Sequence, residues 1–322
     1  MTALASYYGW VIRLADKSGT KSILWREIKA NKVAYVYIAP FFFLFAIFGI
    51  FPILSGFYLS FFKWDGMGAM RWKGLENYER IFTDPVFITS VKNTLFIGLI
   101  AHIPILGGGL VLAYILNGKF VSYQNVFKTV YFLPMVTSAV AITIVFQVLF
   151  GYNFGLLNYF FSFLSIPAIN WLGGTGEYIK PAIIIMFSWK WIGWNMVIYL
   201  SGMQGISEDL YEAATIDGSS AVQTFFLITI PLLKPIILFT LIQSTIGMTS
   251  LFIEPFILTN SLTGGTNNQG ITMMMYLLNK APRGNTIYGV ASAVAYVITM
   301  MVIGISLALQ RLMRGRKEEA LS

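Results

Sequence analysis

Four side chains able to contact a polar ligand stand together inside the apolar stretch IIIMFSWKWIGWNMVIYL. They are Lys190, Trp191, Trp194 and Asn195. Residues four positions apart share one face of a helix, so Lys190 is expected beside Trp194, and Trp191 beside Asn195. Indole rings pack against the C–H faces of a pyranose, while ammonium and amide groups bond to its hydroxyls. The chemistry of this set suits contact with a sugar.

The depth of Lys190 in this stretch supports a functional role. If a helix enters a membrane near Tyr178, Lys190 lies about 18 Å along it, close to the middle of a bilayer. An ionisable group at that depth is costly and is a candidate for a substrate pathway. The alternatives are a tryptophan belt at the membrane surface and a lysine that snorkels to that surface, and the depth argues against both.

Other polar residues inside apolar stretches are further candidates for the pathway. Glu254 is expected near the outer end of a span, where it either pairs with Lys190 or lines an outer gate. Gln147 and Gln243 are weaker candidates, because both can simply hydrogen-bond between helices. The single histidine, His102, precedes Pro104, and we interpret it as a hydrogen-bonding partner between helices rather than a proton relay.

The composition indicates a protein embedded in a membrane. Of the 322 residues, 57% are hydrophobic and 11% are charged, whereas soluble domains have about 25% charged residues. The net charge of +8 lies mostly near span ends and forms no nucleic-acid patch. Without cysteine and with one histidine, the sequence excludes disulfides, thiolate catalysis and a multi-histidine metal site. No removable signal peptide is expected in the first 32 residues.

Apolar runs long enough to cross a bilayer occur six times, which predicts an all-α polytopic fold. The expected spans are Val33–Phe62, Val91–Leu116, Phe127–Phe150, Tyr178–Leu200, Ile236–Leu258 and Gly289–Leu309. An even number of spans leaves both termini on one side. Lysine and arginine are more numerous in the terminal segments and in the second and fourth loops than in the other loops, which favours cytoplasmic termini.

The loop after the fourth span, on the predicted cytoplasmic side, reads YEAATIDGSSAVQTFFLITIPLLKP. Ser207 is expected to cap a short helix with acidic residues in its first turn. Gly218 is placed to end that helix with a positive φ, and Pro231 is expected to end the second helix. Ala213 and Ala214 allow a partner to approach closely, which suggests docking of this helix in a groove. The alternative is a helical hairpin on the membrane surface.

Glu212, Ala213 and Ala214, followed by Gly218 and by Ile230-Pro231, resemble the EAA signature of permease subunits in binding-protein-dependent ABC importers. Isoleucine replaces the usual leucine before the proline. GISEDLYEAATIDGSS is similar to the carbohydrate branch of that family, the maltose, glycerol-phosphate and alginate type. KGLENYERIFTDPVFITSVKNT, YFLPMVTSAVA and LTGGTNNQGITMMMYLL are similar to other segments of these permeases, although Thr266 and Asn267 replace a glycine and a proline of the last one.

The resemblance implies a type I ABC importer permease fold, with a coupling helix that docks on a separate ATPase subunit. Its implied coupling residues are Tyr211, Glu212, Ala213, Ala214, Asp217 and Gly218. The sequence has no G-x-x-x-x-G-K-[ST] loop, so ATP and Mg are expected in the partner and no cofactor in this chain. The implied partners are a second permease subunit in a heterodimer, two ATPase copies, and a periplasmic or lipid-anchored solute-binding protein.

These features predict a sugar transport subunit of the bacterial inner membrane, with no nucleic-acid partner and no enzyme activity of its own. The expected parts are a basic segment (1–32), a permease domain (33–309) with its coupling loop (202–235), and a basic tail (310–322). Lys190 suggests an acidic sugar such as a uronate or alginate oligosaccharide, and a neutral sugar is equally open.

Two other classes of protein fit the residues less well. An ion-gradient-driven secondary transporter of a small polar solute would need paired carboxylates in the membrane or an inverted repeat. A membrane-embedded enzyme would need more acid–base groups than the spans contain.

Overall fold

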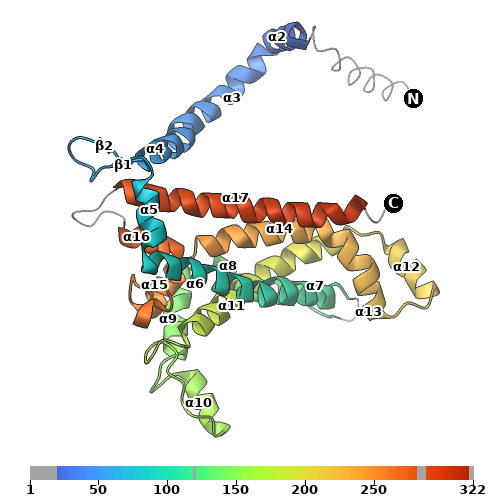
Figure 1. Cartoon of the computed structure of the whole chain (residues 1–322). Helices are drawn as coiled ribbons and strands as arrows, with labels where there is room; N and C mark the ends of the chain where they lie inside the picture. The colour runs from blue at the N-terminus through green and yellow to red at the C-terminus, as the bar shows by residue number, and fades with distance from the viewer. Residues whose placement is uncertain (1–19, 119–120, 281–287, 319–322) are drawn as a thin grey trace. The chain divides into compact units, whose positions relative to one another are not determined.

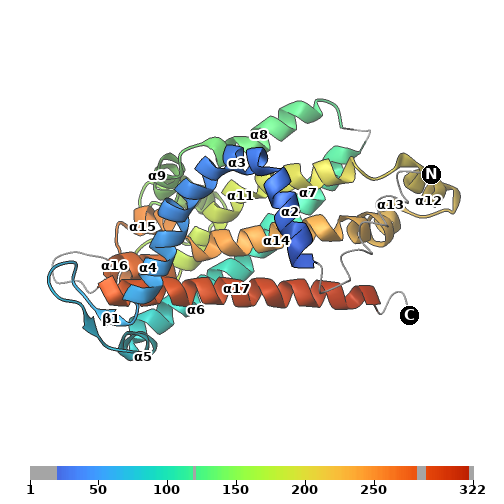
Figure 2. The same ribbon diagram turned by 90° about the horizontal axis from the view of Figure 1, so that it is seen from above.

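The chain is almost wholly helical in the computed structural model, which describes residues 20–118, 121–280 and 288–318 (Figures 1 and 2). Five described helices are long and apolar enough to cross a membrane, or six if one bent pair counts as a span. The prediction of an all-α polytopic membrane protein is therefore confirmed. The one sheet among the described residues is a short hairpin of β1 (Phe62–Lys63) and β2 (Arg71–Trp72). The outermost parts of the predicted terminal segments, 1–19 and 319–322, lie outside the described residues.

The chain divides into two compact units, Met1–Tyr58 and Leu59–Ser322. The first unit holds α2 (Thr20–Ala30), α3 (Lys32–Phe45), the π-helical segment η1 (Ala46–Ile50) and most of α4 (Phe51–Leu59). Together α3, η1 and α4 form one apolar helix, Lys32–Leu59, which matches the first predicted span.

The second unit is a bundle built around α11 (Ile179–Met203), the most buried of the candidate spans. Its neighbours are α6 (Pro85–His102), η2 (Ile103–Gly108), α7 (Gly109–Asn117), α8 (Gln124–Val136) and α14 (Ile230–Thr249). Gly193 permits close contact with the backbone of α8, because a Cβ built there would lie 1.7 Å from the Tyr131 carbonyl oxygen. Three apolar clusters form the core: one along the first half of α11, one along its second half with α7, and one against α17 (Tyr288–Glu318).

The third predicted span, Phe127–Phe150, is wrong as a single helix. It consists of α8 and α9 (Ala139–Leu149), which meet at an angle of 97°. Thr137 adopts extended backbone between them, and its hydroxyl donates to the Leu133 carbonyl oxygen. A threonine that bonds back to the preceding turn offers the backbone an alternative to continuing the helix.

The fifth predicted span, Ile236–Leu258, is wrong at both ends. The helix begins at Ala221, as α13 (Ala221–Thr224) and the π-helical η3 (Phe225–Thr229), and continues through α14 to Thr249. Pro231 does not end it, because Pro231 follows the wider turn of η3, where a residue without an N–H is tolerated. The residues after Thr249 form a separate short helix, α15 (Ile253–Thr259).

The backbone between α15 and α16 (Met273–Lys280) leaves regular structure, and buried side chains bond to it. Asn93 of α6 donates to the carbonyl oxygens of Asn268 and Ile271, at 2.9 and 3.1 Å. The Thr94 hydroxyl accepts from the Met273 N–H at 2.9 Å. Asn267, within the 3-10 turn η4 (Thr266–Asn268), has φ 54°, a conformation that asparagine adopts more readily than most residues. This segment is thus fixed against α6.

A polar cluster joins α16 to the start of α6. Asp84 caps α6: one carboxylate oxygen accepts from the Val86 N–H at 2.8 Å, and the other accepts from the Tyr276 hydroxyl at 2.7 Å. The Lys280 ammonium lies 3.3 Å from the second oxygen. Partial burial raises the pKa of Asp84, but the Tyr276 hydroxyl, the Val86 N–H and Lys280 outweigh it, so the pKa lies below the ordinary 3.8.

The helices that complete this end of the bundle are α5 (Glu76–Thr83), α10 (Leu156–Phe163) and α16, and the helix at the opposite end is α12 (Glu208–Ile216) (Figure 1). Asn77 of α5 is buried and donates to the carbonyl oxygens of Ser60 and Phe62, at 2.7 and 3.0 Å. Side-chain amides therefore satisfy irregular backbone at two places near this end.

Replacing Asp84 with asparagine tests the cluster. Because the folded pKa of Asp84 is lowered, its stabilisation is fully present above about pH 4 and is lost as the pH falls through the folded value. We expect Asp84→Asn to lower stability by about 1.5–3 kcal/mol at pH 7, and by much less near pH 3. Thermal unfolding in lipid nanodiscs at the two pH values measures this. Tyr276→Phe, which keeps the carboxylate, should cost less, and an equal effect of Asp84→Asn at both pH values would contradict the assignment.

Candidate functional site

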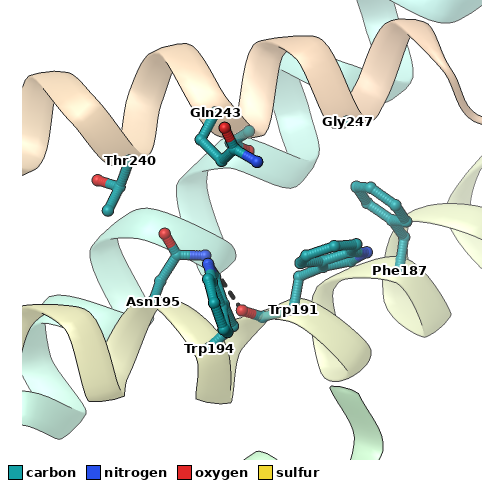
Figure 3. Close-up of a pocket in the computed structure, with 8 residues that line it drawn as sticks. Phe187, Trp191, Trp194, Asn195, Thr240, Gln243 and Gly247 are labelled. Atoms are coloured by element: carbon teal, nitrogen blue, oxygen red, sulfur yellow. Dashed lines mark hydrogen bonds between the residues drawn. The ribbon is translucent and has the colours of Figure 1, made fainter. Parts of the chain in front are cut away.

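A small cavity lies between the middle of α11 and the second half of α14 (Figure 3). Its volume is about 50 Å³. One wall comes from α11 and the other from α14. The lining residues are Phe187, Trp191, Trp194, Asn195, Thr240, Gln243, Ser244 and Gly247.

Four of the predicted pathway residues, Trp191, Trp194, Asn195 and Gln243, meet at this cavity. The Asn195 amide donates to the Trp191 carbonyl oxygen at 3.1 Å, which orients it across from Gln243 (Figure 3). Among the described residues, nothing accepts a hydrogen bond from the buried Trp191 indole N–H. Gln243 is exposed although it lies in the middle of an apolar helix. The cavity therefore presents indole rings and two amides, with no charged group in its lining.

The other four lining residues, Phe187, Thr240, Ser244 and Gly247, were not predicted. Their spacing could have identified them. Thr240, Gln243, Ser244 and Gly247 recur at intervals of three and four, which places small and polar side chains on one face of α14. Phe187 lies one turn before Trp191 on α11. The face of α14 went unnoticed because threonine, serine and glycine are also common at tight helix crossings in membranes.

Lys190 does not line the cavity, although it neighbours Trp191 in sequence. It is buried, and its ammonium bonds to the Glu254 carboxylate of α15 at 2.8 Å. Both side chains are about nine-tenths buried, which makes them an internal ion pair. The sequence left two roles for Glu254, an ion pair with Lys190 or a residue lining an outer gate. In the structure it pairs with Lys190. The sequence predicts Glu254 near the outer end of a long span. In the structure it lies in the first turn of the short helix α15.

Gln147 also lies away from the cavity. Its amide, on α9, donates to the carbonyl oxygen of Ile257 at 2.8 Å and is 3.4 Å from that of Leu258. The amide thereby satisfies the last turn of α15. One ring nitrogen of His102 hydrogen-bonds to the Gly98 carbonyl oxygen of the same helix. No described residue hydrogen-bonds to the other ring nitrogen, which is buried. The expected bond between helices is therefore not made within the described chain.

The predicted coupling residues lie on and after α12, at the end of the bundle away from α15 and α16 (Figure 1). Ala214 is buried, whereas Glu212, Ala213, Asp217 and Gly218 are exposed. The Tyr211 hydroxyl lies 3.3 Å from the Thr229 hydroxyl of η3, which links α12 to the helix that follows. Ser207 does not cap α12 as expected, because its hydroxyl donates to the Asp209 carboxylate instead.

Gly218 has φ +77°, as expected from its place after α12. A Cβ built there meets no atom within 4 Å, so conformation and not space requires glycine at this position. Ser220 then starts α13 with a capping box that includes Gln223. The turn from α12 into the next helix is thus fixed by one left-handed residue and one cap.

A larger cavity of about 740 Å³ adjoins α12. It lies among the ends of α7 and α11 and the start of α13, and its lining includes Tyr211, Glu212 and Thr215. The Tyr114 hydroxyl donates to the Ala221 carbonyl oxygen beside it. Elsewhere, no group of three acidic, histidine or cysteine side chains in the described parts of the chain could hold a metal ion.

Single and double substitutions of Lys190 and Glu254 separate a structural ion pair from a ligand-binding charge. Removing one partner leaves a buried charge unpaired, which costs about 3–5 kcal/mol. We expect Lys190→Met and Glu254→Leu each to lower the unfolding temperature strongly, and the double variant Lys190→Met/Glu254→Leu to recover most of the loss. Thermal unfolding of the reconstituted protein measures all three. Additive losses in the double variant would refute a pairing role.

The fold has a solved counterpart. The chain superimposes on a permease chain in the crystal structure of a bacterial ABC transporter involved in import of the acidic polysaccharide alginate, with a TM-score of 0.74. The match covers 90% of this chain and 98% of that chain at 22% identity. It establishes the type I importer permease fold that the sequence predicted, and nothing about the substrate.

Relatives in sequence identify the family of the chain. The lactose transport system permease protein LacF of Rhizobium radiobacter is 37% identical over 290 residues, covering 89% of this chain and 95% of that protein. The arabinooligosaccharides transport system permease protein AraP of Bacillus subtilis (strain 168) is 34% identical over 308 residues, covering 92% and 95%. Residues 105–315 match the family model of the binding-protein-dependent transport system inner membrane component. The chain belongs to this family of inner-membrane permease components of ABC importers.

Proposed function

We propose that this chain is the permease subunit of an ATP-driven importer that moves a sugar or oligosaccharide across the bacterial cytoplasmic membrane. The observation that carries the proposal is the cavity between α11 and α14, where Trp191 and Trp194 offer stacking surfaces and Asn195 and Gln243 offer amides. Relatives named for transport of lactose, arabinooligosaccharides and trehalose or maltose support a saccharide. Family membership argues against the ion-gradient-driven alternative.

The charge pattern favours a neutral saccharide. Lys190 was the reason to consider an acidic sugar, but its charge is balanced by Glu254 and lies outside the cavity lining. The lining itself carries no charge that would compensate a carboxylate removed from water. We therefore propose a neutral sugar as substrate. Competition of uptake by a uronate oligosaccharide, without competition by neutral sugars, would reverse this assignment.

A second permease subunit is proposed to complete the pathway. The cavity of about 50 Å³ is far smaller than the sites of about 300–1,000 Å³ that usually hold small ligands. Gln243, an exposed amide at mid-helix, would face lipid if the chain stood alone, and an unpaired amide in hydrocarbon is costly. A facing subunit, in a heterodimer, would enlarge the cavity and cover Gln243.

Coupling to ATP hydrolysis is proposed to run through α12. This helix presents Glu212 and Ala213 at the surface, held by the Tyr211–Thr229 contact and the turn at Gly218. We propose that α12 docks on a separate ATPase subunit, present in two copies and binding ATP and Mg, while a periplasmic or lipid-anchored solute-binding protein delivers the sugar. This arrangement requires cytoplasmic termini, with 33–309 as the permease domain, 202–235 as its coupling loop, and 1–32 and 310–322 as basic end segments.

Two glutamines provide a matched test of the pathway. Gln243→Leu removes an exposed amide at the cavity that hydrogen-bonds to no described residue, so we expect stability to stay unchanged. Sugar uptake by the reconstituted importer should fall about tenfold, because one lost hydrogen bond to a ligand is worth about 0.5–1.5 kcal/mol and the new apolar group disfavours a hydroxyl. Uptake and thermal unfolding are measured side by side.

Gln147→Leu is the control for the Gln243 variant. Gln147 caps carbonyl groups of α15, so its loss should lower the unfolding temperature. Uptake per folded protein should change less than in Gln243→Leu. Normal uptake by Gln243→Leu would remove this residue, and with it the α14 wall, from the proposed pathway.

Substitutions of Gly218 test the coupling role of the turn. A β-branched residue with φ near +77° costs about 1–3 kcal/mol of backbone strain, so Gly218→Val should displace α12 while the spans still insert. We expect ATP hydrolysis without matching sugar uptake in Gly218→Val. Gly218→Asn, which tolerates the left-handed conformation, should keep both activities. Coupled transport by Gly218→Val would show that α12 does not transmit the signal.

A further inference from the structure

The short helix α10 exposes a continuous apolar stripe. Phe160, Phe163 and Leu164 are 61%, 67% and 69% exposed. With Leu156 and Tyr159 they recur at intervals of three and four, so all five lie on one face of the helix. A patch of this kind on a folded protein marks a surface that contacts lipid or another protein.

The stretch of sequence around the stripe contains no charge. No aspartate, glutamate, lysine or arginine occurs between Lys128 and Glu177. A surface that docks a soluble protein normally has a polar rim with charged residues, and this one has none. Contacts between membrane helices favour glycine, alanine and serine, and the stripe contains only leucine, tyrosine and phenylalanine. Both comparisons disfavour a protein partner and favour lipid.

The opposite face of α10 fixes the helix level with the start of α11. Leu157 and Phe161 pack against the apolar cluster that contains Trp171 and Ile179, the first residue of α11. The Phe161 and Trp171 rings are 6.3 Å apart. The candidate membrane span α11 begins at Ile179, so α10 lies level with the expected membrane–water interface, where aromatic residues concentrate.

Hydrogen bonds make this placement specific. The buried Asn158 side chain donates to the carbonyl oxygens of Tyr152 and Ile169, at 3.1 and 2.9 Å, and accepts from the Ile169 N–H at 3.0 Å. Asn158 thereby links α10 to the segment before it and to the segment after it. Figure 1 shows α10 beyond the end of α9 and away from α14 and α17.

We propose that α10 lies in the interface of the lipid bilayer and inserts its stripe among the acyl chains near the headgroups. The partner is the lipid surface itself. Since the segment has no charge, the attachment depends on buried apolar area and not on anionic headgroups. The inference rests on membership in a membrane family and is independent of the sugar, the second permease and the ATPase.

The natural absence of cysteine allows a direct test. Phe160→Cys on the stripe and Ser162→Cys, off the stripe at a cavity lined also by Asn153 and Asn158, each receive a spin label, in the complete importer with partner subunits free of reactive cysteine. Collision rates with oxygen, which concentrates in lipid, and with a water-soluble nickel chelate are measured in nanodiscs. We expect oxygen to dominate at position 160 and nickel at position 162. The pattern should be the same in phosphatidylcholine alone and with added phosphatidylglycerol.

Each other outcome at position 160 refutes the proposal. A label reached mainly by nickel would place the stripe in water. A label reached by neither probe would mean that a protein, either the second permease or the binding protein, covers the stripe. An oxygen preference that appears only with phosphatidylglycerol would replace apolar insertion with attraction to anionic lipid. The probe accessibilities at positions 160 and 162 do not depend on whether the proposed sugar transport or the proposed coupling to ATP hydrolysis is correct.

Discussion

The structure depends on one constraint: backbone that leaves a helix inside the bundle must find its hydrogen bonds within the protein. The segment between the end of α14 and the start of α16 is the main case. Asn93 bonds to carbonyl oxygens in its loop, Gln147 bonds to the end of α15, and the buried Thr272 hydroxyl donates to the Leu251 carbonyl oxygen at 2.6 Å. These side chains come from α6, α9 and the segment itself. Their hydrogen bonds satisfy the backbone groups of the irregular connection, and that connection brings Glu254 to Lys190.

The Lys190–Glu254 ion pair lies beside the cavity but outside its lining, with the Lys190 ammonium 5.8 Å from the centroid of the Trp191 ring. Lys190 faces α15, where Glu254 neutralises it, and the next residue, Trp191, lines the cavity toward α14. A buried pair contributes little net stability, but breaking it is costly, so it fixes where α15 sits. The cavity between α11 and α14 is lined mainly by aromatic rings, amides and small side chains. The buried charges therefore hold two helices together, while the cavity lining is uncharged.

Much of this was predictable from periodicity and composition, and the exceptions have physical causes. Apolar length located α11 to within three residues but put the start of the α6–η2–α7 helix six residues late, and spacing on α11 identified Trp191, Trp194 and Asn195. The start of the helix that includes α14 was missed because Pro231 normally ends a helix, and only the π-helical turn before it explains why this one continues. The bend after α8 depends on tertiary contacts. The sequence offered the pairing of Lys190 with Glu254 as one of two roles, and only tertiary contacts decide between them, because the two residues are 64 positions apart.

One continuous helix connects the proposed coupling segment to the cavity. From Ala221 to Gln243 it spans about 33 Å at 1.5 Å per residue, and it carries Thr240 and Gln243 at its far end. At its near end the Tyr211–Thr229 contact and the Tyr114–Ala221 hydrogen bond join it to α12 and α7. A displacement of α12 therefore reaches this helix through Thr229, the last residue of η3. Because Pro231 and Pro235 lie between Thr229 and the cavity, they mark the point at which the helix bends most easily. Rotation about that point would move the α14 wall relative to α11, which the ion pair holds against α15.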